Sequence, residues 1–214
     1  GKIRPGRFQL PGNVSSQYLS GLLLAAPLLE GKTEVVVKEP LESRSYVTLT
    51  IRALESFGVH VHETKQTTKE GTFTTFTVPA HSPYTTPGQV SVEGDWSNAA
   101  FWLAAGCLAG PGVSVTQLDL ASPQGDRTIL AALALLGARL SRKGTQATAA
   151  PDTLNACSID VSDCPDLVPP LAAVACFAQG TTHITGAERL RLKESDRLET
   201  VTAALNALGG CVRI

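Results

Sequence analysis

Three short polar segments of this chain have residue types and spacing that could bind anions and move protons. The first lies near the C-terminus, where Lys193, Glu194 and Arg197 stand close together. An arginine can hold a carboxylate or a phosphate through two parallel hydrogen bonds, and a lysine acts as a point charge. A carboxylate within such a basic cluster is a candidate proton donor or acceptor. A solvated charged edge has the same composition, and the spacing alone supports both interpretations equally.

The second segment, Gly12 to Gln17, joins an expected strand to an expected helix. Ser15, Ser16 and Gln17 offer two hydroxyls and an amide beside the free N–H groups of the helix start. Such a loop can cradle a phosphate or a polyol. Serine is also a common helix N-cap, and this simpler interpretation of Ser15 is favoured when the segment is considered alone.

The third segment is Cys164-Pro165-Asp166, which precedes an apolar run. Asp166 occupies the same place in an internal repeat as Asn13 and Asp95. A helix cap explains all three residues, because short polar side chains accept hydrogen bonds from the N–H groups of a first turn. A catalytic role for Asp166 therefore needs other support.

The internal repeat determines where these segments lie. Units of roughly 75 residues each contain a helix-like apolar run, a β-rich stretch and a second helix pattern. The second helix of each unit ends at a glycine, namely Gly58, Gly137 or Gly209. Each unit is expected to alternate strand and helix, roughly βαβαβ with an extra strand in the first, which defines an α/β fold. The polar segments would then stand at helix N-termini, which favour anions.

The expected elements follow from apolar periodicity and turn residues. Helices are expected over 16–29, 46–57, 97–108, 126–136, 166–178 and 195–208. Strands are expected over 8–10, 33–37, 60–62, 73–78, 113–115, 181–184 and 189–193. The segment 81–88, which contains two prolines, is the best candidate for a domain boundary.

Composition excludes several classes of protein. The chain has 214 residues, 43% of them hydrophobic, and a net charge of −1, which argues against a general nucleic-acid binder. No apolar run reaches the roughly 18 residues that a membrane span needs, and no signal peptide is visible. The 5 cysteines form no Cys-x-x-Cys pair, which indicates reduced thiols in the cytoplasm. We interpret them as small buried hydrophobes.

Motifs for metals and cofactors fail. Gly31-Lys32-Thr33 lacks the first glycine of a P-loop and follows a helix instead of preceding one. His60 and His62 could share one face of a strand, but an ordinary surface strand is favoured because no third ligand stands nearby in sequence. No metal and no cofactor is predicted. Because the chain starts with Gly1, we expect an internal piece of a longer protein.

Taken together, five stretches resemble the 3-phosphoshikimate 1-carboxyvinyltransferase family, also called 5-enolpyruvylshikimate-3-phosphate synthase. They are Gly12-Asn13-Val14-Ser15-Ser16-Gln17, Val92-Glu93-Gly94-Asp95, Gln124-Gly125-Asp126, Pro165-Asp166 and Arg191-Leu192-Lys193-Glu194-Ser195-Asp196-Arg197. The resemblance implies an inside-out α/β barrel of repeated units, of which this chain would hold three of six. Residues 1–88 would be the last unit of one domain, and residues 89–214 would be two units of the second.

The resemblance also implies a role for each matching residue. The residues that would bind shikimate 3-phosphate are Ser15, Ser16, Gln17, Ser43 and Tyr46. Gln17 would also lie near phosphoenolpyruvate. Arg189, where some members carry asparagine, would contact the same substrate.

The remaining matches carry the chemistry that the resemblance implies. Asp166 would be the base for the 5-hydroxyl, and Lys193 would bind that hydroxyl and the neighbouring ring oxygens. Glu194 would donate a proton to the methylene carbon. Arg197 would clamp phosphoenolpyruvate.

The implied reaction is transfer of the enolpyruvyl group from phosphoenolpyruvate to the 5-hydroxyl of shikimate 3-phosphate, with release of phosphate. The complete enzyme is expected to be a cytoplasmic monomer, and this piece alone is expected to be inactive because half of its cleft is missing. One alternative is enolpyruvyl transfer to UDP-N-acetylglucosamine, although the cysteine-bearing loop of that family has no match here. The other alternative is a repeat module that binds an anion without chemistry.

Overall fold

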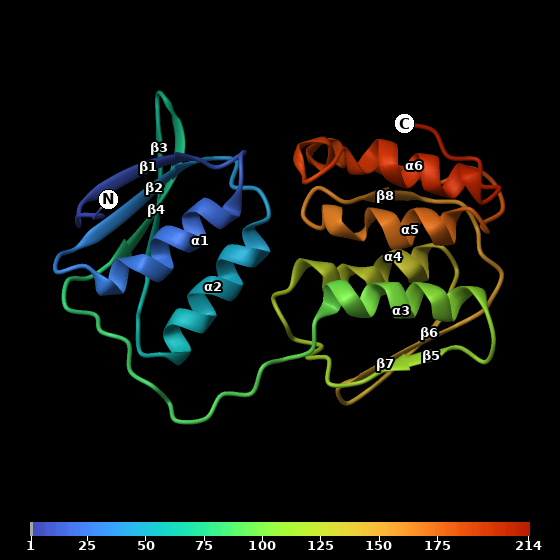
Figure 1. The fold of residues 1–214 in the computed structure, drawn as a ribbon, viewed down its shortest axis with the longest axis horizontal. Coiled ribbons are helices and arrows are strands. Elements are labelled where there is room, and N and C mark those ends of the chain that lie inside the picture. The colour runs from blue at the N-terminus through green and yellow to red at the C-terminus, as the bar shows by residue number, and fades with distance from the viewer. Residues whose placement is uncertain (1) are drawn as a thin grey trace. The chain divides into compact units, whose positions relative to one another are not determined.

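The computed structural model describes residues 2–214, which divide into two compact units (Figure 1). The first unit ends at Ser91 and the second begins at Val92. Each unit has its own cluster of buried apolar side chains. None of the helices in residues 2–214 combines the length and the apolar character that crossing a bilayer requires.

The first unit packs two helices against a four-stranded sheet. Its elements are β1 (Arg7–Pro11), α1 (Ser16–Ala25), a 3₁₀ turn (Ala26–Leu28), β2 (Thr33–Lys38), α2 (Arg44–Ser56), β3 (His62–Thr68) and β4 (Gly71–Val78). The strand order is β1-β2-β4-β3, with β1 parallel to β2 and β4 antiparallel to both of its neighbours. Val35, Val37 and Phe76 from the sheet pack with Leu19 and Leu23 from α1, and burial of these side chains holds the unit together.

The second unit spans Val92–Ile214. Its first elements are α3 (Trp96–Leu108), β5 (Val113–Val115), a 3₁₀ turn (Gly125–Thr128), α4 (Ile129–Leu135), β6 (Arg139–Lys143) and β7 (Gln146–Ala150). They are followed by β8 (Ser158–Asp160), a 3₁₀ turn (Pro165–Leu167), α5 (Val168–Ala175), β9 (His183–Thr185), a 3₁₀ helix (Glu188–Leu192) and α6 (Arg197–Ala207). One sheet has the antiparallel order β5-β7-β6, and β8 pairs in parallel with β9.

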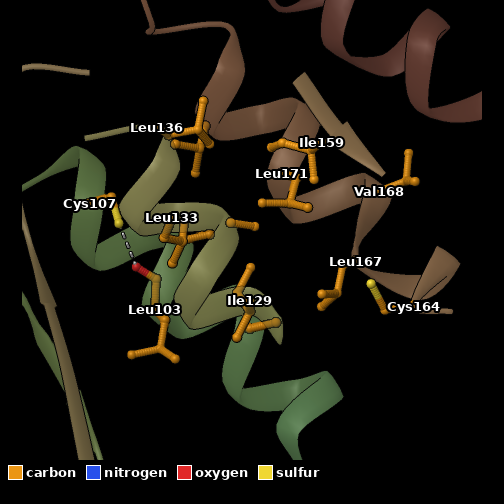
Figure 2. Packing of buried hydrophobic residues seen from close by; sticks show 14 of the residues in the cluster. Leu103, Cys107, Ile129, Leu133, Leu136, Ile159, Cys164, Leu167, Val168 and Leu171 are labelled. Carbon is orange, nitrogen blue, oxygen red and sulfur yellow. Dashed lines mark hydrogen bonds between the residues drawn. The ribbon is translucent and has the colours of Figure 1, made fainter. Parts of the chain in front are cut away.

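The core of the second unit lies where α3, α4 and α5 meet (Figure 2). Leu103, Leu133 and Leu171 come from these three helices, and all are 0% exposed. Ile159 of β8 joins them and ties the parallel strand pair to the helices. Apolar burial of this kind is the main force that fixes the C-terminal repeat, which carries the acidic and basic segments, onto the rest of the unit.

Backbone hydrogen bonds confirm the repeat. The second helix of each unit ends with a glycine at positive φ, which is 80° at Gly58, 95° at Gly137 and 94° at Gly209. The residue after each glycine donates its N–H to the carbonyl five positions earlier, over 2.9, 3.0 and 2.9 Å, in the pairs Val59–Leu54, Ala138–Leu133 and Gly210–Leu205. This is the Schellman arrangement, which glycine adopts without steric cost.

The predicted strand over 189–193 is wrong, because the structure forms a 3₁₀ helix over Glu188–Leu192. Alternation requires Leu190 and Leu192 to share a buried face, but Leu190 is 0% exposed and Leu192 is 82% exposed. The Leu190 N–H donates to the Ala187 carbonyl over 3.0 Å, which is the spacing of a 3₁₀ turn.

Other boundaries also differ from the prediction. The strand expected over 60–62 begins only at His62 and continues to Thr68 as an exposed edge strand. The helices expected from 126 and 166 open with 3₁₀ turns, and α5 begins at Val168 with proline in its first turn, where a missing N–H costs nothing. Among the described residues, the second repeat starts directly with α3 and has no strand before it.

Candidate active site

In the first unit, Ser15 caps helix α1. Its hydroxyl accepts a hydrogen bond from the Gln17 N–H over 3.2 Å, as the capping interpretation predicted. The Ser15 hydroxyl proton is not used by this bond, so the side chain can still donate to an anion. Ser16 is buried and Gln17 is exposed beside it.

Gly12 joins the Ser15 loop to the loop that carries Ser43. The Gly12 N–H donates to the Lys38 carbonyl over 3.0 Å, and the Gly12 carbonyl accepts from the Glu42 N–H over 3.1 Å. A Cβ atom at Gly12 would lie 2.5 Å from the carbonyl oxygens of both Lys38 and Pro40. The two loops therefore lie side by side, and only glycine permits this approach.

Ser43 stands at the start of α2 in the left-handed conformation, with φ 50° and ψ 42°. This conformation is uncommon for a residue with a side chain, and it often marks functional positions. Ser43 is 6% exposed, and its side chain does not cap the helix. The Tyr46 N–H donates to the Ser43 carbonyl over 3.1 Å, so the two predicted ligands belong to one rigid turn.

Glu39, which no sequence motif identified, anchors the segment before this turn. Its carboxylate accepts from the Leu41 N–H over 2.6 Å and from the Thr74 hydroxyl over 2.5 Å. Burial raises the pKa of Glu39, but the hydrogen bonds from Thr74 and Leu41, with Lys65 and Arg44 nearby, outweigh it and lower the pKa below its ordinary value. An acid directly before Pro40, at the end of an apolar strand, is the signal that could have identified it.

In the second unit, Asp166 is not a helix cap. It lies inside the 3₁₀ turn Pro165–Leu167, which has no side-chain cap. Asp95, by contrast, caps α3 by accepting from the Ser97 N–H over 2.8 Å and from the Asn98 N–H over 3.3 Å. The repeat therefore explains Asp95 as a cap and leaves the Asp166 carboxylate for other contacts.

Asp166 lies against the two cations of the C-terminal segment. Its Oδ1 is 2.7 Å from Arg197 Nη1 and 3.4 Å from Lys193 Nζ. The second guanidinium nitrogen, Arg197 Nη2, is 2.7 Å from Glu194 Oε2. One arginine thus bridges two carboxylates, and four of the residues singled out from the sequence form one cluster: Asp166, Lys193, Glu194 and Arg197.

The Glu194 side chain is 79% exposed. A hydrogen bond from its own backbone N–H and the hydrogen bond and charge of Arg197 lower the pKa of Glu194 below its ordinary value. A proton donor needs a pKa near the working pH. The contact with Arg197 therefore favours the ionised form of Glu194.

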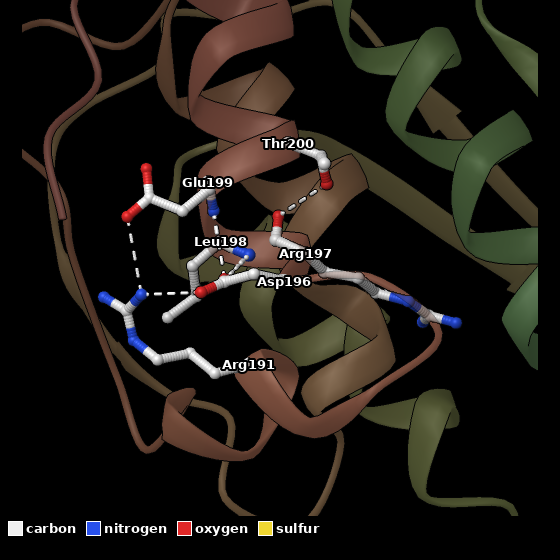
Figure 3. A network of polar contacts seen from close by, with 6 residues as sticks. All are labelled: Arg191, Asp196, Arg197, Leu198, Glu199 and Thr200. Carbon is white, nitrogen blue, oxygen red and sulfur yellow. Dashed lines mark hydrogen bonds and ion pairs between the residues drawn. The ribbon is translucent and has the colours of Figure 1, made fainter.

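Arg197 of this cluster is the first residue of helix α6, and Asp196 is the N-cap of the helix. Asp196 Oδ1 accepts from the Leu198 and Glu199 N–H groups over 3.1 and 3.2 Å. Its other oxygen accepts from Arg191 Nη1 over 2.7 Å (Figure 3). Arg189 lies in the preceding 3₁₀ helix and is half-buried.

The cysteines only partly match their prediction as buried hydrophobes. Cys107 and Cys164 are buried, and burial raises their pKa to about 11 and about 12. Cys176 and Cys211 are exposed, so the prediction is wrong for these two. All five are free thiols.

Two solved structures have a fold similar to that of this chain. EPSP synthase from Acinetobacter baumannii matches with a TM-score of 0.70 at 24% identity, over 96% of this chain and 45% of that chain. The enolpyruvyl transferase NikO from Streptomyces tendae matches with a TM-score of 0.60 at 16% identity, over 94% of this chain and 48% of that chain. At these identities the likeness defines the fold alone, and it confirms a part of the inside-out α/β barrel.

The sequence identifies the family within this fold. Residues 2–214 match the family described as EPSP synthase (3-phosphoshikimate 1-carboxyvinyltransferase), and the chain belongs to that family. The 3-phosphoshikimate 1-carboxyvinyltransferase of Clostridium kluyveri is 42% identical over 209 residues, which are 98% of this chain and 47% of that protein. The Nitrosomonas europaea protein of the same name is 40% identical, over 98% of this chain and 48% of its own length. The chain spans about half the length of the curated relatives it matches.

Proposed function

We propose that this chain is part of an enzyme that transfers the enolpyruvyl group of phosphoenolpyruvate to the 5-hydroxyl of shikimate 3-phosphate and releases phosphate. The observation that carries the proposal is the cluster of Asp166, Lys193, Glu194 and Arg197, in which two carboxylates share one guanidinium. The reaction joins two anionic substrates, and it needs one group to accept a proton and another to donate one. The cluster supplies both kinds of group next to cations that hold the substrates.

The addition step assigns one proton movement to each carboxylate. Asp166 takes the proton of the 5-hydroxyl as that oxygen forms a bond to the enol carbon of phosphoenolpyruvate. Glu194 gives its proton to the methylene carbon, which becomes a methyl group. Elimination reverses these roles: the bond to phosphate breaks, Asp166 returns its proton to the departing phosphate, and Glu194 takes a proton from the methyl group, so the enol double bond forms again. Lys193, 3.4 Å from Asp166, would bind the same hydroxyl oxygen and stabilise its developing negative charge.

Arg197 links substrate binding to the state of Glu194. Its two nitrogens bind Asp166 and Glu194 in the chain as it stands. When Arg197 turns towards the phosphoenolpyruvate anion, it breaks its contact with one or both of these carboxylates. Since Arg197 is a main cause of the lowered pKa of Glu194, this exchange would raise that pKa towards the range that suits a proton donor.

The first unit supplies the proposed contacts to shikimate 3-phosphate. Ser15 keeps a free hydroxyl proton, and Ser16 and Gln17 follow it in the first turn of α1. Ser43 and Tyr46 stand on the neighbouring loop, which Gly12 holds against the Ser15 loop. A helix start with hydroxyl donors suits a sugar phosphate.

The direct test is turnover by the complete protein. Given shikimate 3-phosphate and phosphoenolpyruvate, it should release phosphate and form an enolpyruvyl ether, and it should not use UDP-N-acetylglucosamine. The 214-residue piece should release no phosphate, because electrostatic stabilisation needs both walls of a closed site. A complete protein that binds shikimate 3-phosphate but never turns over would instead be an anion-binding module.

The remaining proposals concern the complete protein in the cell. Five free thiols suit a reducing compartment, and we propose the cytoplasm. The expected monomeric state of the complete enzyme stays a prediction, as does the assignment of the two units to two domains.

A further inference from the structure

We propose that Arg191 is a positioning residue that holds the segment carrying Lys193 and Glu194 in its reactive place. The proposal rests on the proposed function. Arg191 Nη1 lies 2.7 Å from Asp196 Oδ2 and 3.4 Å from Glu199 Oε1 (Figure 3). Arg191 precedes Lys193 and Glu194 in the sequence, and the two partners of Arg191 follow them. The contacts of Arg191 therefore form a clamp across the segment between.

The segment inside the clamp has no apolar anchor of its own. The 3₁₀ helix ends at Leu192, which is 82% exposed, and α6 begins at Arg197. Between them, Glu194 and Ser195 are exposed and Lys193 is half-buried. With no buried side chain here, polar contacts must fix where Lys193 and Glu194 stand. These are their own contacts with Asp166 and Arg197, together with the Arg191 contact that joins the two ends of the segment.

Asp196 connects the clamp to the helix. One of its oxygens accepts two N–H groups of the first turn of α6, and the other accepts Arg191. Arg197, which binds both Asp166 and Glu194, is the first residue of that helix. The contact between Arg191 and Asp196 thus fixes the distance between the 3₁₀ helix and the start of α6.

Arg191 acts through geometry and not through its charge on the site. The groups that lower the pKa of Glu194 are its own N–H, Arg197 and Lys193. Both contacts of Arg191 come from one nitrogen, Nη1. A lysine ammonium is also a single donor centre. Lysine can therefore substitute for Arg191, whereas it substitutes poorly for a guanidinium that binds through two nitrogens.

The test compares three variants of the complete enzyme in steady-state turnover. Arg191→Ala should lower kcat about 10- to 100-fold, as expected when reacting groups move by about 1 Å, with KM values changed less than about threefold. Its melting temperature should fall by no more than about 2 °C, since exposed ion pairs contribute little to stability. Arg191→Lys should restore kcat to within about threefold of the parent. The matched control is Lys32→Ala, which removes an exposed 2.5 Å ion pair with Glu34 in the other unit and should leave kcat unchanged.

The proposal is overturned if Arg191→Ala behaves like Lys32→Ala, or if Arg191→Lys is as slow as Arg191→Ala. Amide exchange of residues 193–196 gives a readout that does not need turnover, and it should be faster in Arg191→Ala than in the parent. A parent enzyme without turnover would refute the proposed function, while unchanged exchange in Arg191→Ala would refute the clamp.

Discussion

Replacement of Gly12 by alanine should destabilise the first unit through steric contacts with the backbone. The new Cβ would lie 2.5 Å from two backbone carbonyl oxygens, those of Lys38 and Pro40, and 3.0 Å from the Leu41 Cα. These atoms belong to backbone and cannot rotate away. Overpacking costs about 1–3 kcal/mol, and a rigid backbone neighbour places this site near the upper end, at about 2–3 kcal/mol.

That cost corresponds to roughly a 30- to 150-fold change in the local opening equilibrium. The assay is amide exchange in the complete protein, followed at Val35, Val36 and Val37 of the neighbouring strand β2, which should exchange faster by this factor. Both tryptophans lie in the second unit, so the fluorescence transition should stay in place. Affinity for shikimate 3-phosphate should fall because the Ser15 loop is displaced.

The control is a second glycine in the same unit. Gly21 lies inside helix α1, and a Cβ there would meet nothing within 4 Å. Gly21→Ala should therefore stabilise the helix by about 0.5–1 kcal/mol and slow exchange. If both alanine variants shifted exchange in the same direction, or if Gly12→Ala changed nothing, the steric argument would be wrong.

Three further predictions follow from the polar contacts and from the burial of side chains. Arg197→Ala should raise the pKa of Glu194 towards its ordinary value, as measured by NMR titration of the carboxyl carbon; an unchanged pKa would mean that Arg197 does not control it. Thr74→Val should cost about 1–3 kcal/mol at neutral pH, because it removes a donor from the partly buried Glu39 carboxylate. Folding lowers the pKa of Glu39, so this stabilisation is present at pH values above the unfolded pKa of 4.5 and is lost as the pH falls. The unfolding free energies of parent and variant should therefore converge when urea titrations are made in acid. Cys176 and Cys211 should react with a thiol reagent in the folded piece while Cys107 and Cys164 do not, and equal reactivity of all four would contradict their burial.

The repeat could be predicted from sequence because it depends on local rules. Glycines that end helices need positive φ, and Gly58, Gly137 and Gly209 adopt it with matching hydrogen bonds. Apolar periodicity located α1, α2 and α3 to within a few residues, because each of these helices buries one continuous face. The caps at Ser15 and Asp95 were also predictable, since a cap involves only residues two or three positions away.

The failures come from contacts between segments far apart in the sequence. The alternation of charged and apolar residues over 189–193 predicted a strand. Whether Leu192 is buried depends on which other segment packs against it, and in the structure Leu192 is exposed. The repeat predicted that Asp166 would be a helix cap like Asp95. In the structure Asp166 lies in the 3₁₀ turn that begins at Pro165, and its carboxylate contacts Arg197, which is far away in the sequence. Thr74 lies on another strand from Glu39, so no local pattern could pair the two.

Turnover of Asp166→Asn in the complete enzyme tests the central claim most directly. The change keeps the size of the side chain and removes its capacity to take a proton, so kcat should fall about 10²- to 10⁴-fold, which is the usual contribution of a general base. Asp95→Asn, at the equivalent repeat position, retains an acceptable helix cap and should keep kcat within a few-fold of the parent. Turnover of Asp166→Asn within a few-fold of the parent would show that Asp166 is not the base.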